Sequence, residues 1–204
     1  IKPPQNSSKT ITATYQRPYH MHGSVGPSAA MALFENQEIK VWTHSQGVYP
    51  LRLALADVLE IEENRIHVVH VPAAGCYGHN GADDAALDAV LAARAFPGKP
   101  VLLKWERVDE HSWEPYGSAM QIELQANMDK SGKILYWNHE TYSDTHLKRP
   151  SAHGKESRLL ASWHMQVPKQ APHVKPLTGY HTGIHRNADP IYDFNDRRIV
   201  KHLV

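Results

Sequence analysis

Short stretches of alternating or continuous hydrophobic residues mark the first half of the chain. Alternation with a period of two is typical of β-strands that bury one face. In the third such stretch, Ile39 and Val41 fall on one face and Trp42 on the other. The pattern predicts five strands, the last of them a short buried one, over residues 9–15, 31–34, 38–43, 66–71 and 101–105.

Two longer segments repeat hydrophobic residues at the spacing of an α-helix. From Val48 to Glu60, leucines and a valine recur every three or four positions, and Pro50 suits the first turn of such a helix. Ser45, just before it, is the expected N-cap. The Ala-rich segment from Ala82 to Ala95 places its larger side chains on one stripe, which predicts a second helix.

The second half of the chain contains a β-hairpin pattern. Residues 119–128 alternate in polarity, residues 129–133 contain the Asp, Ser and Gly of a turn, and residues 134–142 form the returning strand. Strands, helices and a hairpin in this order predict the α+β class, with a mixed sheet and helices packed on a face.

The same pattern predicts how the chain is organised. Residues 1–8 contain Pro, Asn and Ser and indicate a linker, and residues 9–204 are expected to form a single domain. From about residue 146 to residue 190 prolines and histidines follow no clear period. We expect a long irregular excursion there, which in a compact domain is usually functional or covers a partner surface.

Composition limits the classes of partner. The 204 residues have a formal net charge of +1 and are 41% hydrophobic, so no nucleic-acid partner is indicated. No hydrophobic run reaches the length of a membrane span in this chain. The single cysteine, Cys76, excludes an internal disulfide and a cysteine-based zinc site.

A loop between the fourth strand and the second helix has an unusual composition. It reads Ala-Ala-Gly-Cys-Tyr-Gly-His-Asn-Gly over residues 73–81. Glycine lets the backbone approach a ligand, and N–H groups at a helix start favour an anionic or oxo group, although a tight turn explains the same composition. Gln46 follows the strand that ends at Thr43, where its amide could donate to such a group or be purely structural.

The histidines allow an alternative function. There are 15 of them, and His20 and His22 would share a face of an extended segment, whereas His181 and His185 would do so only in a helix. The alternative is therefore a non-catalytic α+β module that binds a transition metal through histidines. Surface or hydrogen-bonded histidines explain the same count.

Two further patterns have a catalytic and a structural interpretation. Cys76 and His79 could form a nucleophilic pair, or Cys76 could fill space as a small residue. The acidic pair Asp83–Asp84 falls in the first turn of a helix, where it suits the helix dipole. Arg107 and Glu110 have the spacing of an ion pair on a helix.

Several motifs in fixed order resemble the large subunits of molybdenum hydroxylases, the xanthine dehydrogenase/aldehyde oxidase superfamily. That superfamily has a Thr-Gln strand end, a helix, an Asn-Arg-Ile strand entry, a GGGFGGK loop and a Pro-Val strand with a later Arg and Glu-Asp. The corresponding segments here are residues 43–46, 64–66, 74–80 and 100–110. The resemblance is good over about residues 10–144, and the loop is most similar to the isoquinoline 1-oxidoreductase/nicotinate dehydrogenase-like subgroup.

The resemblance implies a site for molybdopterin, the molybdenum cofactor. Gln46 would hydrogen-bond near an oxo or sulfido ligand or the pterin, and Gly75, Cys76, Tyr77 and Gly78 would form the loop beside the metal. The reaction it implies is hydroxylation of a small aldehyde or N-heterocyclic substrate with water, with electrons leaving through iron–sulfur centres. The implied partners are the remainder of the molybdenum subunit and an iron–sulfur subunit or domain.

The chain departs from the superfamily at several positions. Tyr77 stands where the superfamily has Phe, and Cys76 where it has a third Gly, so the loop is more crowded. Asn80–Gly81 replaces the Lys-Glu pair of xanthine dehydrogenases, which argues against xanthine as substrate. The resemblance also implies that the general-base Glu lies beyond Val204. We therefore expect no catalytic residue here, and a cofactor-domain fragment that is inactive and without cofactor by itself.

Overall fold

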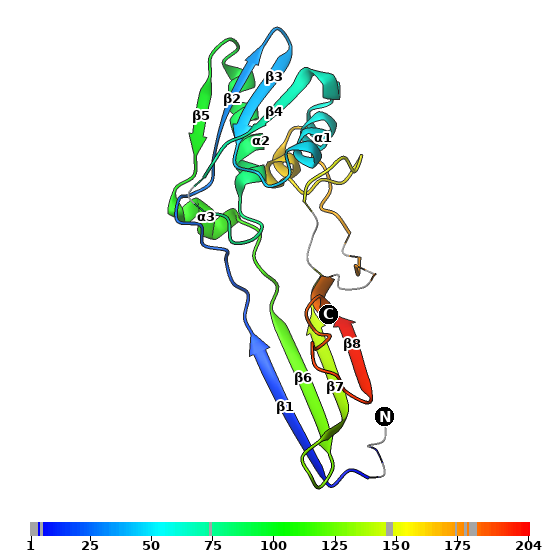
Figure 1. The fold of residues 1–204 in the computed structure, drawn as a ribbon. Helices are drawn as coiled ribbons and strands as arrows, with labels where there is room; N and C mark the ends of the chain where they lie inside the picture. Colours follow the sequence, from blue (N-terminus) through cyan, green and yellow to red (C-terminus); the bar gives the residue numbers. More distant parts are fainter. Residues whose placement is uncertain are drawn as a thin grey trace. The chain divides into compact units, whose positions relative to one another are not determined.

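The computed structural model describes residues 4, 6–73, 75–145, 149–173, 175–177, 179 and 183–204 (Figure 1). The chain divides into two compact units. Unit 1 comprises Ile1–His20, Gly117–Leu147 and Val174–Val204, and unit 2 comprises Met21–Tyr116 and Lys148–His173. Half of the predicted linker, residues 1–3 and 5, lies outside the described residues. The single domain over residues 9–204 stays a prediction.

Unit 2 is built on a mixed four-stranded sheet in the order β4-β3-β2-β5 (Figure 1). The strands β3 and β4 are parallel, and the other neighbours are antiparallel. A parallel pair needs a crossover connection, which the helix α1 supplies. The elements are β2 (Ala29–Glu35), β3 (Glu38–Thr43), α1 (Val48–Leu59), η1 (Glu63–Arg65), β4 (Ile66–His70), α2 (Ala82–Ala95) and β5 (Val101–Lys104).

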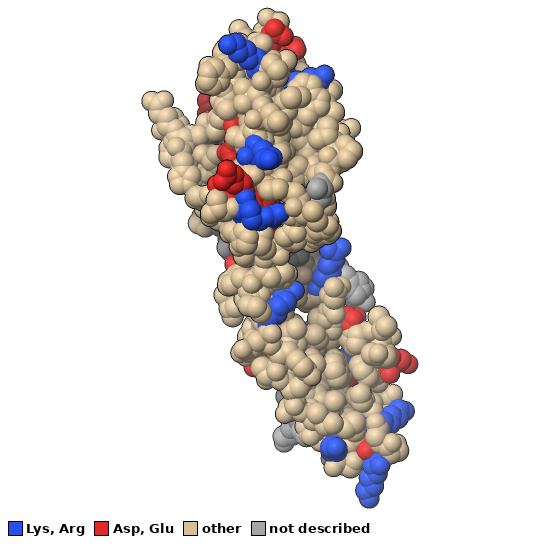
Figure 2. Space-filling view, turned by 90° about the vertical axis from the view of Figure 1, so that its left-hand side faces the viewer, with Lys and Arg blue, Asp and Glu red and all other residues tan. Residues whose placement is uncertain are grey.

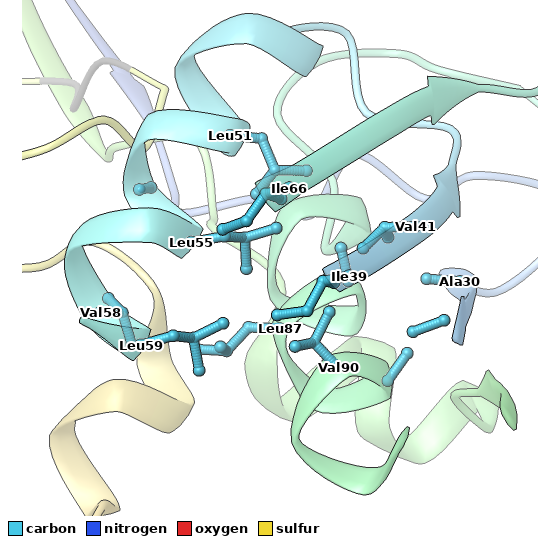
Figure 3. Packing of buried hydrophobic residues seen from close by; sticks show 14 of the residues in the cluster. Ala30, Ile39, Val41, Leu51, Leu55, Val58, Leu59, Ile66, Leu87 and Val90 are labelled. Atoms are coloured by element: carbon cyan, nitrogen blue, oxygen red, sulfur yellow. The ribbon is translucent and has the colours of Figure 1, made fainter. Parts of the chain in front are cut away.

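The helices α1 and α2 pack on one face of this sheet and form the core of unit 2 with it (Figure 3). Ile39 and Val41 of β3 are buried there, as the alternation predicts, while Trp42 on the other face is half-buried. Each large aliphatic side chain that is fully buried contributes about 1.5–3 kcal/mol. The largest of those in the core are Ile39, Val41, Leu51, Leu55, Leu87, Val90 and Leu159.

Two local predictions for unit 2 are wrong. The N-cap of α1 is Gly47, without a side-chain cap, because the Ser45 hydroxyl donates instead to Asp83. The strand β5 is not buried on both faces, since Val101 and Leu103 pack against the core whereas Leu102 lies on the opposite face of the sheet. Leu102 is consequently 72% exposed.

The helix α3 (Arg107–Trp113) was not indicated by the hydrophobic pattern. The fully buried carboxylate of Glu110 accepts hydrogen bonds from the N–H (2.7 Å) and the hydroxyl (2.8 Å) of Ser28. Arg107 donates to the carbonyl of Val25 at 2.8 Å. The predicted ion pair between Arg107 and Glu110 is therefore wrong, and both residues tie α3 to the segment that leads into β2.

Unit 1 contains a second mixed sheet, in the order β1-β6-β7-β8 (Figure 1). The strands β6 and β7 form the predicted hairpin, β1 pairs antiparallel with β6, and β8 runs parallel to β7. The strands are β1 (Lys9–Arg17), β6 (Met120–Met128), β7 (Ile134–Ser143) and β8 (Arg197–Leu203). The α+β class is confirmed, but with two mixed sheets where one was expected.

The predicted excursion contains two short 3₁₀ turns among its described residues, η2 (Leu160–His164) and η3 (Gly183–His185). Just before η2, Leu159 is fully buried in the core of unit 2. This part of the excursion is therefore an integral part of unit 2. Among the described residues, no helix combines the length and the hydrophobicity that a membrane crossing requires.

Candidate functional site

Gln46 and Cys76 are in contact in unit 2. The side-chain amide of Gln46 donates to Sγ of Cys76, and the thiol donates to the carbonyl of Gly78 at 3.3 Å. Gln46 follows β3, and Cys76 follows β4. Because these two strands are parallel, their carboxyl ends lie at the same edge of the sheet, where α/β units usually bind ligands. The topology thus brings together residues that are 30 positions apart.

The glycines of the loop have conformations and surroundings that other residues would not fit. Gly75 has φ of +108° and Gly78 has φ of +147°, both in the region that favours glycine. A Cβ atom at position 78 would lie 1.8 Å from Cδ2 of His22. At position 75 it would lie 2.7 Å from the hydroxyl oxygen of Tyr77. Backbone conformation and close packing therefore both require glycine here.

The loop presents hydrogen-bond donors on its surface. Cys76 is exposed, and Tyr77 is 60% exposed. The main-chain N–H groups of Cys76, Tyr77 and Gly78 make no hydrogen bond to any described residue. Together with the Gln46 amide, which contacts the Cys76 sulfur, these groups are the uncharged hydrogen-bond donors of the loop.

A buried carboxylate lies behind the loop. Asp83, in the first turn of α2, accepts hydrogen bonds from the Ser45 hydroxyl, from His79 Nε2 at 3.1 Å and from Arg149 at 3.1 Å. Burial acts to raise the pKa of Asp83, but the hydrogen bonds from His79 and Ser45 and the charges of His79 and Arg149 outweigh it and lower the pKa. Asp83 is thus an anion that joins three separate segments, a role beyond the predicted one at the helix dipole.

Arg149 connects Asp83 with Gln46. One nitrogen of its guanidinium group pairs with Asp83 at 3.1 Å, and another donates to Oε1 of Gln46. The side chain of Arg149 is 22% exposed and that of Asp83 is fully buried. Sequence reasoning missed Arg149 because it lies 103 positions from Gln46, within the irregular excursion, and belongs to no motif.

Asp84 attaches a further part of the excursion to α2. A carboxyl oxygen of Asp84 accepts a hydrogen bond from the N–H of Leu160 at 2.8 Å, and the residue is 3% exposed. Burial raises the pKa of Asp84 to about 8, and the negative charges of Asp83 and Asp88 act in the same direction. The side chain of Asp84 therefore makes its contact inside the protein, with the segment at Leu160, and does not face the loop.

The histidines do not support the metal-binding alternative in the part of the chain that the structure describes. There, no group of three or more His, Cys, Asp or Glu residues could hold a metal ion. His20 forms an isolated β-bridge with Gly117, and Nδ1 of His22 lies 3.7 Å from Oε1 of Glu114. His181 lies outside the described residues.

The predicted nucleophilic pair is also not formed. His79 is paired with Asp83, and the partners of the Cys76 thiol within the described residues are Gln46 and Gly78. No histidine is in hydrogen-bond contact with Cys76 there. Nucleophilic catalysis by Cys76 would need a histidine as a base within hydrogen-bond reach, so the described residues do not support it.

A large open groove lies elsewhere in unit 2. It has a volume of about 1470 Å³ and runs along the C-terminal half of α1, the following residues 60–65 and the segment 165–170. Gln46 lies at the opposite, N-terminal end of α1. The groove is therefore separate from the loop at residues 75–78.

Two solved oxidoreductase structures have a similar fold. Quinoline 2-oxidoreductase from Pseudomonas putida 86 matches with a TM-score of 0.61 and 20% sequence identity, over 68% of this chain and 18% of that chain. Aldehyde oxidoreductase from Desulfovibrio gigas matches with a TM-score of 0.57 and 18% identity, over 68% of this chain and 15% of that one. At this level of sequence identity, these two similarities show a shared fold.

Two curated relatives are similar in sequence. A nicotinate dehydrogenase subunit from Pseudomonas putida is 40% identical over 136 residues, which is 67% of this chain and 11% of that protein. The aldehyde oxidoreductase molybdenum-binding subunit PaoC from Escherichia coli is 30% identical over 134 residues, 65% of this chain and 18% of that protein. The chain thus matches less than a fifth of the length of either relative.

The sequence resemblance, the fold and the relatives lead to the same family. The family described as "Molybdopterin cofactor-binding domain" matches residues 4–168, which include Gln46, the loop at residues 75–78 and Arg149. The chain belongs to the molybdopterin cofactor-binding domain family of the molybdenum hydroxylases.

Proposed function

We propose that this chain forms part of the cofactor site of an oxidoreductase that hydroxylates an aldehyde or a carbon of an N-heteroaromatic ring. Membership of the family supports the molybdenum cofactor. The relatives named nicotinate dehydrogenase and aldehyde oxidoreductase support the two substrate classes. The remainder of the molybdenum subunit and an iron–sulfur subunit or domain would complete the enzyme.

The contact between Gln46 and the loop at residues 75–78 carries this proposal. The glycines at positions 75 and 78 allow the positive φ angles of the loop and its close packing against Tyr77 and His22, and the loop N–H groups have no partner within the described residues. Together with the Gln46 amide they offer several donors without a positive charge. Such a set suits the oxo, sulfido and pterin acceptors of a molybdenum cofactor.

When bound, the molybdenum centre supplies the redox chemistry, in which C–H and water give C–OH, protons and electrons for the iron–sulfur centres. The residues of this chain would hold and orient that group. Gln46 and the N–H groups of Cys76, Tyr77 and Gly78 would donate hydrogen bonds to it. The exposed ring of Tyr77 would lie at the edge of the bound cofactor. Proton abstraction is assigned to another part of the enzyme.

Packing at Gly81 supports a substrate other than a purine. A Cβ atom at this position would lie 2.2 Å from the ring of Trp105, so a longer side chain has no room. The position at which the resemblance places the purine-binding Glu therefore cannot supply a carboxylate. Asp83 and Asp84 do not replace it, because both are buried and bonded within the protein.

Charges of both signs lie on the face drawn in Figure 2. On the face drawn in Figure 2, the described Lys and Arg residues are scattered among Asp and Glu and do not form one basic patch. A polyanionic ligand would need such a patch.

The direct test is to trace the oxygen of the product. The native protein that carries this chain is incubated with nicotinate or benzaldehyde and an artificial electron acceptor in water enriched in oxygen-18. We expect the hydroxylated product to carry the label in its new oxygen atom. Unlabelled product, or no turnover of either class, would refute the proposed function.

A further inference from the structure

The orientation of the Gln46 amide decides what the loop can bind. A glutamine side chain presents either an oxygen acceptor or an NH₂ donor, and the two ends have nearly the same shape. With the NH₂ group toward residues 75–78, the site takes a hydrogen-bond acceptor. With the oxygen there, it would repel an oxo or sulfido group.

We propose that Arg149 is a positioning residue that fixes this orientation. The inference rests on the proposed function, in which Gln46 faces the cofactor. An arginine has only hydrogen-bond donors, so the end of the amide that contacts it must be the oxygen. The NH₂ group of Gln46 is thereby directed to Cys76 and the loop.

The guanidinium group of Arg149 is itself held in place. It pairs with Asp83, which is fully buried and also accepts hydrogen bonds from Ser45 and His79. The planar fork of arginine reaches two acceptors at once, which the single ammonium of a lysine does not do in the same geometry. Asp83 therefore orients Arg149, and Arg149 orients Gln46.

The same arrangement strengthens the donor without adding net charge. The positive charge of Arg149 is balanced by the Asp83 carboxylate, whose pKa is lowered. A donor at Oε1 polarises the amide, so the NH₂ group of Gln46 becomes a better donor to an acceptor at the loop. The ligand class assigned to this point is a metal-bound oxo, sulfido or similar acceptor.

Alkylation of Cys76 measures the orientation without any cofactor. In the native full-length protein, the rate of iodoacetamide labelling at Cys76 is followed by peptide mass spectrometry. Loss of one charge-assisted hydrogen bond in Arg149→Gln should free the amide that is hydrogen-bonded to the sulfur and accelerate labelling by about tenfold. Arg149→Lys, which keeps a charge for Asp83, should give most of this increase.

The Gln46→Ala variant shows whether Arg149 acts on Cys76 through Gln46 or through a general change in the structure. In Gln46→Ala, the sulfur of Cys76 has already lost the amide hydrogen bond, so adding Arg149→Gln should change its labelling rate less than twofold. Arg52→Gln removes another ion pair of unit 2, with Glu63, and should leave the rate unchanged. The inference would be overturned if Arg149→Gln accelerated the labelling of Cys76 equally with and without Gln46→Ala. It would also be overturned if Arg149→Gln alone caused no acceleration.

Molybdenum content provides the cofactor-dependent half of the experiment. Arg149→Gln should lower the molybdenum retained after dialysis, and in Gln46→Ala it should lower it no further. If the unmutated protein contains no molybdenum, the proposed function fails, while the labelling of Cys76 still decides whether Arg149 positions Gln46. Additive losses of molybdenum in the two variants would also contradict the inference.

Discussion

Single residues of the loop are constrained in two separable ways, by backbone conformation and by space. Gly78 has φ of +147°, and a Cβ atom there would collide with the His22 ring at 1.8 Å. Gly98 has φ of +75° but nothing within 4 Å of a Cβ atom. Both glycines lie at positive φ, but only Gly78 is crowded, and its φ also lies further from the left-handed region that other residues can adopt.

We predict that Gly78→Ala lowers the free energy of unfolding by roughly 2–4 kcal/mol, because backbone strain and a collision add. Gly98→Ala should cost about 1 kcal/mol, from strain alone. Chemical denaturation of the two variants measures the difference. Equal losses would show that the contact with His22 is relieved at no cost.

Asp84 makes stability depend on pH in a direction unusual for a carboxyl group. Its pKa rises from 3.8 to about 8 on folding, mainly because it is buried. The folded protein then holds a proton that the unfolded chain has released. The resulting stabilisation is complete below pH 4 and is lost as the pH rises towards 8.

We predict that Asp84→Asn flattens the fall in the free energy of unfolding between pH 4 and pH 8. The amide oxygen of Asn can still accept the N–H of Leu160, so the excursion should stay attached. Denaturation curves across this pH range provide the measurement. A variant with the same pH dependence as the unmutated protein would mean that Asp84 is ionised when folded.

At the scale of residues, the sequence identified the loop but not what holds it. The composition of the loop and the place of Gln46 after a strand drew attention to both, and the resemblance to family motifs then implied their role. The structure shows that Gln46 and Cys76 are in contact. Their role toward a cofactor stays a proposal. Arg149 could not be found, because its partners lie far away in the sequence and only tertiary structure brings a guanidinium group to a particular carboxylate.

At the scale of elements, periodicity succeeded where an element packs against the core through one face. The helix α2 was predicted with its observed bounds, Ala82–Ala95, and α1 to within one residue. The short helix α3 was missed because it has only 7 residues and its buried residue is a glutamate. The strand β8 was missed because it is held by pairing with β7, which no local pattern reveals.

The helix α3 gives a prediction of its own. Glu110→Ala would leave the N–H and the hydroxyl of Ser28 buried without their acceptor, at a cost of roughly 2–4 kcal/mol in the free energy of unfolding. Glu110→Gln keeps one acceptor oxygen and should cost less than half of that. Thermal or chemical unfolding distinguishes the two. If both variants are as stable as the unmutated protein, α3 does not anchor the segment before β2.

At the scale of the whole molecule, each of the two units has its own mixed sheet, and the predicted site residues all belong to unit 2. The α+β class followed from the order of elements. The division into two units did not, because strands β1, β6, β7 and β8 come from three distant parts of the chain. Since the chain matches 11% and 18% of the length of its curated relatives, activity is to be measured on the native protein.

The molybdenum content of that native protein tests the central claim most directly. Inductively coupled plasma mass spectrometry is applied to the unmutated protein, to Gln46→Ala, and to Gln16→Ala, which alters an exposed glutamine of unit 1. We expect stoichiometric molybdenum in the unmutated protein and in Gln16→Ala, and a several-fold loss in Gln46→Ala. Absence of molybdenum from the unmutated protein, or full retention in Gln46→Ala, would contradict a cofactor site at Gln46 and residues 75–78.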